Sequence, residues 1–299
     1  MKKYILFLTL ILASSSSSWS QEWLTSLDAA KRIALVQDKL LFMIWEDAAL
    51  IPYPVIMNDE KGNGVLIENL FDHEEISRII WDYFVPVKVN ESHYAELYDQ
   101  MKSTKKQSYM AQFEDDNIKI MDANCHIVNT SISPEAYFNL SQFIHTYALK
   151  TTFLNAELKN YSEQKDFSTS YRLASKYTDY AILVDEKVRG DIINLADIYL
   201  DEAENFLSNS DFDDKTNFGQ KIKMLRLSKY LLQNKPKKVL RNLKKFDLAE
   251  MDEINQPFLA FLYYTAYQLR NDEKNSELWK SKVSLVNLRK AELITKLHF

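Results

Sequence analysis

The chain contains a single cysteine, Cys125, among its 299 residues. Thiol–disulfide exchange by a dithiol enzyme needs two cysteines, because one attacks as a thiolate and the other resolves the mixed disulfide. One cysteine also cannot close an internal disulfide. The sequence therefore excludes dithiol catalysis, and it leaves Cys125 as either an unpaired turn thiol or the site of a mixed disulfide with a partner.

Two adjacent carboxylates follow a continuous apolar run. The run spans Leu40 to Trp45, and Glu46 and Asp47 come directly after it. Such a run predicts a strand covered on both faces, and ligands often bind at the C-terminal ends of strands in α/β sheets. Carboxylates there can do acid/base work or help to bind a cation. Neighbouring side chains on a strand point to opposite faces, which weakens the case for a shared site. Three interpretations of Trp45, Glu46 and Asp47 therefore stay open: a catalytic site, a ligand contact, or a solvated strand end.

The remaining motifs give little support to other chemistry. The five histidines are scattered, with no pair at the spacing of metal ligands on one helix or strand. The chain also lacks a glycine-rich phosphate-binding motif and a Gly-x-Ser-x-Gly nucleophile motif. We therefore expect no metal site and no cofactor.

A basic stretch runs from Lys215 to Lys245 without any acidic residue. It predicts a face for an anionic partner, such as an acidic polysaccharide, lipid headgroups or another protein. Attraction to the acid-rich segment from Asp197 to Asp214 and ordinary solvation of helix faces are the alternatives. The candidate binding residues are Lys221, Lys229, Lys237, Lys238, Arg241 and Lys244.

The first residues have the pattern of a secretory signal. Lys2 and Lys3 precede an apolar run from Tyr4 to Ala13, and a serine-rich tract follows. The run is much shorter than the roughly 20 residues that span a membrane. We expect residues 1–20 to be a signal peptide and the mature chain to be soluble, periplasmic or secreted, without a transmembrane segment. Nucleic acid is not expected as a partner of an exported protein.

Residues 21–150 alternate between helix and strand signals. A helix is expected to about Asp38, then the strand at 40–45, an irregular segment at 46–70 and a helix facing inward through Ile76, Ile79, Ile80 and Tyr83. A strand at 84–89, a helix near 94–101, a hairpin of 118–121 with 126–128, and a helix capped by Ser133 complete this half.

This order of elements resembles the thioredoxin fold. The opening Trp23, the segment Ala29-Ala30-Lys31 and the run from Lys39 to Phe42 are similar to exported thioredoxin-like proteins. The segment from Ile118 to Cys125 is similar to the family's strand ending in an Asp-x-x-Gly turn, with Cys125 at the glycine position. The resemblance covers about residues 21–150.

The resemblance implies where a redox site would lie. Its cysteine pair would fall near Ala48, Ala49, Leu50 and Ile51, and its cis-proline near Asp116. None of these residues matches the family pattern. The resemblance therefore implies a degenerate redox site with no catalytic residue.

Helix patterns alone fill residues 151–299. They lie at 167–177, 182–207, 218–234, 236–246, 257–270 and 276–297, with hints of tetratricopeptide-like hairpins but no clean repeat. The expected fold class is an α/β thioredoxin-like domain, residues 21–150, followed by an all-α helical-hairpin or bundle domain, residues 151–299.

The resulting functional hypothesis is a non-catalytic, exported thioredoxin-like protein that binds another protein or acts as a scaffold. One alternative is an accessory of a thiol–disulfide oxidoreductase, or a single-thiol redox protein using Cys125. Another is a binder of an anionic envelope polymer through the basic helical face.

Overall fold

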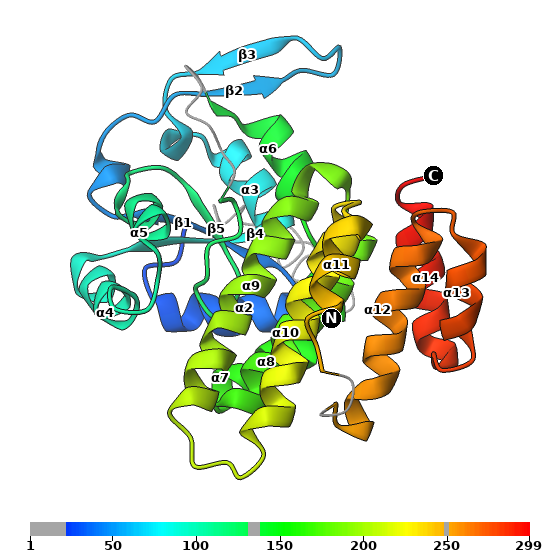
Figure 1. The fold of residues 1–299 in the computed structure, drawn as a ribbon. Coiled ribbons are helices and arrows are strands. Elements are labelled where there is room, and N and C mark those ends of the chain that lie inside the picture. The colour runs from blue at the N-terminus through cyan, green and yellow to red at the C-terminus, as the bar shows by residue number, and fades with distance from the viewer. Residues whose placement is uncertain (1–21, 131–137, 248–250) are drawn as a thin grey trace, which may run out of the picture.

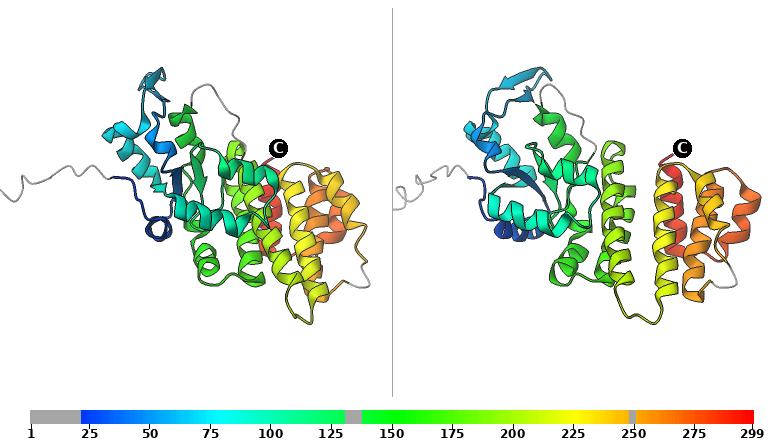
Figure 2. Two further views of the ribbon diagram at one scale, coloured as in Figure 1. Left: turned by 90° about the vertical axis from the view of Figure 1, so that its left-hand side faces the viewer. Right: turned by 60° about the vertical axis from the view of Figure 1, so that its left-hand side comes forward.

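The computed structural model describes residues 22–130, 138–247 and 251–299. An α/β part is followed by a helical part, and Figure 2 shows them arranged along one axis, with α7 to α9 between the sheets and the C-terminal helices. No helix in these three ranges is long and apolar enough to cross a membrane. The expected signal peptide, residues 1–20, and the expected helix cap Ser133 lie outside the described residues.

The central sheet has the order β4-β1-β5. Strand β1 (Leu40–Trp45) pairs in parallel with β4 (Phe84–Val89) and antiparallel with β5 (Lys119–Met121). Isolated bridges extend the sheet at both edges, where Leu24 pairs with Val87 and Ile127 pairs with Met121. The strands at 40–45 and 84–89 are confirmed with the expected bounds, whereas 126–128 contributes only the single bridge at Ile127.

The side chains of β1 alternate between two apolar layers. Leu40, Phe42 and Ile44 belong to one buried cluster, and Leu41, Met43 and Trp45 belong to the other. Alternation arises because successive strand residues point to opposite faces of the sheet. Both faces are therefore covered, as the continuous apolar run predicted.

Different helices cover the two faces. The face of Phe42 packs against α3 (Glu74–Tyr83) and α6 (Leu140–Tyr147), and the other face packs against α2 (Leu27–Gln37), α4 (Glu91–Met101) and α5 (Gln107–Glu114). In α3 the buried Ile76 and Ile80 belong to the cluster of Phe42 and the buried Trp81 belongs to the other cluster, whereas Tyr83 is 47% exposed. Tyr83 is the last residue of α3, and the exposure of its side chain shows that the expectation that it faces inward is wrong.

A second small sheet corrects the expectation of an irregular segment at 46–70. Strands β2 (Val55–Asn58) and β3 (Gly64–Ile67) form a hairpin, and β6 (Phe138–Asn139) pairs with β2 in parallel. The side chain of Asp59 accepts backbone hydrogen bonds from Lys61 and Asn63, and Gly62 takes a φ of 84° between them. The hairpin projects at the top of Figure 1.

The helical part begins after a short turn at Thr151–Phe153. Its helices are α7 (Asn155–Glu163), α8 (Phe167–Leu183), α9 (Glu186–Ser208), α10 (Lys215–Leu232), α11 (Pro236–Leu243), α12 (Gln256–Gln268), α13 (Glu273–Lys280) and α14 (Leu285–Lys296). The single helix expected at 276–297 is instead two helices, because Ser284 caps α14 by accepting a hydrogen bond from the backbone of Asn287. One buried apolar cluster runs from the face of Phe42 through this helical part, so the two parts share a core.

Three helices end on residues other than glycine in the left-handed conformation. Asp38, Asn234 and Asn271 have φ values of 55°, 52° and 54°. In each case the next residue's N–H reaches back to the last turn of the helix, the geometry of a Schellman motif. These hydrogen bonds join Lys39 to Ala34, Lys235 to Tyr230, and Asp272 to Tyr267. Asparagine and aspartate tolerate this conformation better than other residues with side chains.

We predict that replacing Asn271 with alanine lowers the free energy of unfolding by about 1 kcal/mol, because alanine is disfavoured at positive φ. Asn271→Gly should keep the stability within a few tenths of a kcal/mol of the native chain. Urea unfolding followed by circular dichroism measures both variants. Equal stability of the two would contradict this account of the helix end.

Candidate functional site

The loop that the resemblance assigned to the redox pair holds no nucleophile. Ala48 to Leu50 form a single turn of 3-10 helix after β1, and Ile51 returns to an extended conformation. Ala48 and Ala49 pack partly against the core, whereas Leu50 and Ile51 are exposed. The turn does not continue into a helix, because the chain runs on into the β2–β3 hairpin.

Trp45 is fixed at the end of β1. Its indole N–H lies 3.2 Å from the carbonyl oxygen of Phe113 and 3.1 Å from that of Asp115. The ammonium of the buried Lys119 lies 5.3 Å from the indole centroid and donates to the side chain of Asp115. Burial lowers the pKa of Lys119, although the charge of Asp115 works in the opposite direction. The indole is thus engaged within the protein.

The neighbouring candidates are exposed. Glu46 and Asp47 lie at the surface where β1 ends, and Asp116 is exposed in the segment before β5. Every described peptide bond is trans, including those around Asp116. These carboxylates and the alanine turn lie at the same end of the sheet, since Trp45 links that end to the segment before β5.

Cys125 lies in the turn that follows β5. It has a φ of 65°, and only 3% of its surface is exposed. Burial raises the pKa of its thiol to about 12. Since the thiolate is the reactive form of cysteine, this thiol is protonated and unreactive near neutral pH. The expectation that Cys125 occupies a turn is confirmed.

The same turn carries a fully buried carboxylate, Asp122. Its Oδ1 accepts backbone hydrogen bonds from Asn124, at 2.9 Å, and from His126, at 3.1 Å. Its Oδ2 accepts hydrogen bonds from the hydroxyls of Tyr177 in α8 and Tyr199 in α9. Burial, with the charge of Asp122, raises the pKa of both phenols well above the ordinary value. Two tyrosines of the helical part are therefore tied to the turn as hydrogen-bond donors.

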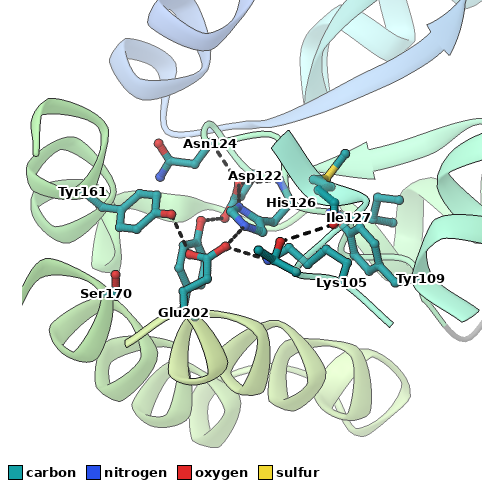
Figure 3. A network of polar contacts seen from close by, with 12 residues as sticks. Lys105, Tyr109, Asp122, Asn124, His126, Ile127, Tyr161, Ser170 and Glu202 are labelled. Atoms are coloured by element: carbon teal, nitrogen blue, oxygen red, sulfur yellow. Dashed lines mark hydrogen bonds and ion pairs between the residues drawn. The ribbon is translucent and has the colours of Figure 1, made fainter. Parts of the chain in front are cut away.

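Glu202 of α9 supplies a second carboxylate, which contacts the turn from the helical part (Figure 3). Its Oε1 lies 2.8 Å from Nε2 of His126 and 2.6 Å from Nζ of Lys105. Its Oε2 accepts a hydrogen bond of 2.6 Å from the hydroxyl of Tyr161 in α7. Burial opposes the charged form of Glu202, but His126 and then Lys105 hold its pKa well below 4.5. His126 thus lies between two carboxylates, with Nδ1 3.9 Å from Asp122.

A cavity of about 890 Å³ opens beside this network. Its walls come from α4, the α4–α5 loop, α5, the turn at Asn124 to His126, α7 and α9. We call it the interface groove, because the α/β part and the helical part each supply a wall. Its volume is within the range typical of ligand sites.

The lining of the interface groove is mixed in character. Cations, anions and amides come from both parts of the chain, and the apolar side chains lie between them. The polar members include Lys105, Lys106, Gln112, Thr130, Tyr161, Lys165, Asn194, Asp197, Asp201 and Asn205, and the apolar members include Leu97, Met101, Ile198 and Phe206.

The cations of the basic stretch differ in the side chains that they contact. Arg226 lies 2.6 Å from both Asp201 and Glu204, and Lys229 lies 2.6 Å from Asp197. For these cations the expected alternative, attraction to the acid-rich segment, is confirmed. Lys221 lies over the ring of Phe218, and Lys244 is exposed. Lys237, Lys238 and Arg241 line a separate hollow near α11.

Sequence reasoning missed the residues that build the interface groove. Lys105 and Glu202 are 97 positions apart, and neither stands in a recognisable motif. His126 was noted only as one of the scattered histidines. Among these residues, only Asp122 could have been identified from the sequence. It is the first residue of the turn that resembles Asp-x-x-Gly, and that turn places the carboxylate of Asp122 next to the central strand. Within the described ranges, no group of three or more His, Cys, Asp or Glu side chains is arranged to hold a metal ion.

Comparison with known proteins finds no match to this chain among family models, curated proteins or solved structures.

We predict that the thiol of Cys125 is labelled by an aromatic disulfide reagent at pH 8 at least about 100-fold more slowly in the native protein than in urea, because burial keeps it protonated. Absorbance at the wavelength of the released thiolate follows the reaction. Cys125→Ser provides the blank. A native rate within a few-fold of the unfolded rate would refute the buried position.

Glu202 should make stability depend on acid pH. Because its folded pKa lies below 4.5, its stabilisation is complete above about pH 4.5 and is lost as the pH falls toward the folded value. In urea unfolding between pH 3 and 7, the free energy of unfolding should therefore fall more steeply toward acid pH in the native chain than in Glu202→Gln. At pH 7, Glu202→Gln should be about 1–3 kcal/mol less stable than the native chain. The exposed Glu163→Gln should follow the native curve. Parallel curves for the native chain and Glu202→Gln would contradict the role of Glu202.

Proposed function

We propose that this protein is a non-catalytic, thioredoxin-like binding protein that holds an extended segment of a partner protein in the interface groove. The fold assignment is supported by the order α2, β1, hairpin, α3, β4, α4 and α5, then β5 with its turn, and α6. It is also supported by a central strand that is parallel to one neighbour and antiparallel to the other, with helices on both faces. The exported location belongs to the same proposal.

The observation that carries the proposal is the interface groove itself. It is a large cavity whose walls come from both parts of the chain, and its floor is held by the hydrogen bonds of Glu202. Proteins bind ligands preferentially in such clefts between structural units. A rigid floor lowers the ordering cost of binding, because Lys105 and His126 are held before the ligand arrives.

The lining favours a polypeptide ligand. Amide side chains such as Gln112, Asn194 and Asn205 can donate to and accept from a peptide backbone. Lys106 and Lys165 offer positive charge to acidic side chains of a peptide, whereas Asp197 and Asp201 are already paired with Lys229 and Arg226. Apolar side chains such as Leu97 and Phe206 add contact area.

The state of the thiol supports binding over thiol chemistry. Cys125 also lines the interface groove, but the burial of its thiol raises its pKa to about 12. The loop from Ala48 to Ile51 supplies no second thiol. A role in binding uses what the interface groove offers, whereas the single-thiol alternative needs a thiolate that the site disfavours.

A matched pair of variants tests the proposal. Ser108 lines the interface groove and its neighbour Gln107 does not, and both are exposed on α5. Linear peptides selected by display on the native protein should bind Ser108→Trp at least about tenfold more weakly, because the indole fills the cavity, while Gln107→Trp should change the Kd less than about twofold. Fluorescence anisotropy with labelled peptide measures the Kd.

Two outcomes would overturn the proposal. Failure to select any binding peptide, or equal affinity of both variants, would remove the interface groove as a peptide site. Turnover of a disulfide substrate by the native protein would remove the non-catalytic part. Thermal melting of both variants verifies that a loss of binding does not come from unfolding.

A further inference from the structure

Cations in and near the basic stretch differ in their counterions. Arg226 and Lys229 face the acidic side chains of α9 at salt-bridge distance. By contrast, Lys235, Lys237, Lys238, Arg241 and Arg270 have no carboxylate within 4.0 Å among the residues that the structure describes. Internal salt bridges therefore account for the placement of Arg226 and Lys229 but not for that of these five cations.

These five cations surround one hollow. Asn234 takes a left-handed conformation at the end of α10, so the chain turns directly into α11, and α11 packs against α12. This packing brings Arg270, which follows α12, next to the start of α11. The cavity measures about 770 Å³, and all five cations line it. We call it the basic hollow.

The chemistry of the basic hollow selects its ligand. No acidic residue lines it, and the charge of Asp272 reaches Arg270 only from outside the lining. Like charges held together raise the energy of the empty site, and a multivalent anion removes that cost. Guanidinium groups such as those of Arg241 and Arg270 bind phosphate or sulfate oxygens in pairs. The ring of Tyr230, 3.9 Å from Nζ of Lys238, helps to orient that ammonium.

We propose that the basic hollow is a binding site for a compact ligand that carries several phosphate or sulfate groups. A free polyphosphate and a sulfated oligosaccharide share this chemistry. The site is separate from the interface groove, which has a mixed lining and different residues. The inference therefore goes beyond the proposed function and does not depend on it.

Isothermal titration with tripolyphosphate and, separately, with a sulfated oligosaccharide tests the site. Arg241→Ala combined with Arg270→Ala should weaken binding at least about tenfold, since each arginine supplies charge-assisted hydrogen bonds. The matched control combines Lys223→Ala with Lys244→Ala, which also removes two positive charges but from residues of the basic stretch outside the lining. This control should change the Kd less than about twofold. The probe that binds more tightly identifies the source.

Several outcomes would overturn the inference. Absence of binding by both probes, or an equal loss in the control pair, would show only diffuse attraction to basic helices. Binding to vesicles of anionic phospholipid without binding to either soluble probe would assign the charge to a membrane surface instead. Ser108→Trp should leave the binding of both probes unchanged, so a failure of the peptide site is distinguished from a failure of this one.

Discussion

The buried carboxylate of Asp122 constrains how the two parts of the chain meet. An isolated charge at this depth would be strongly destabilising. It is tolerated because the turn supplies two backbone N–H donors and α8 and α9 supply two tyrosine hydroxyls. The turn is therefore satisfied only when the helical part is docked, which makes this hydrogen bonding a determinant of the relative position of the two parts.

The interface groove follows from the same constraint. On the face of Phe42 the two parts join through a continuous apolar cluster, which packs closely. On the side of Asp122 they join through Glu202, His126 and Lys105, whose directional contacts leave space beside them. The turn at Asp122 supports the interface between the two parts, whereas the loop at Ala48 to Ile51 forms a single 3-10 turn that holds no nucleophile.

The cations near the interface groove and those of the basic hollow differ in their surroundings. Acidic residues of α9 neutralise the nearest cations of α10, which holds these long helices together along the wall of the interface groove. In the part of the chain that the structure describes, the five cations around the basic hollow have no salt bridge of this kind. The basic stretch therefore contributes both to the pairing of α9 with α10 and to the lining of the basic hollow.

Local pattern determined much of the fold and little of the site. The apolar run from Leu40 to Trp45 specified a strand covered on both faces, the helical half followed from periodicity, and one cysteine excluded dithiol catalysis. The hairpin at 55–67 had turn residues that could have revealed it, and the division at Ser284 had a capping residue. Tertiary structure alone decided that Lys105, His126 and Glu202 meet, and which cations of the basic stretch are paired. Hydrophobic periodicity indicates which face of a helix or strand is buried. A contact between polar side chains 97 residues apart depends instead on how the folded elements pack against one another, and no local sequence pattern encodes that packing.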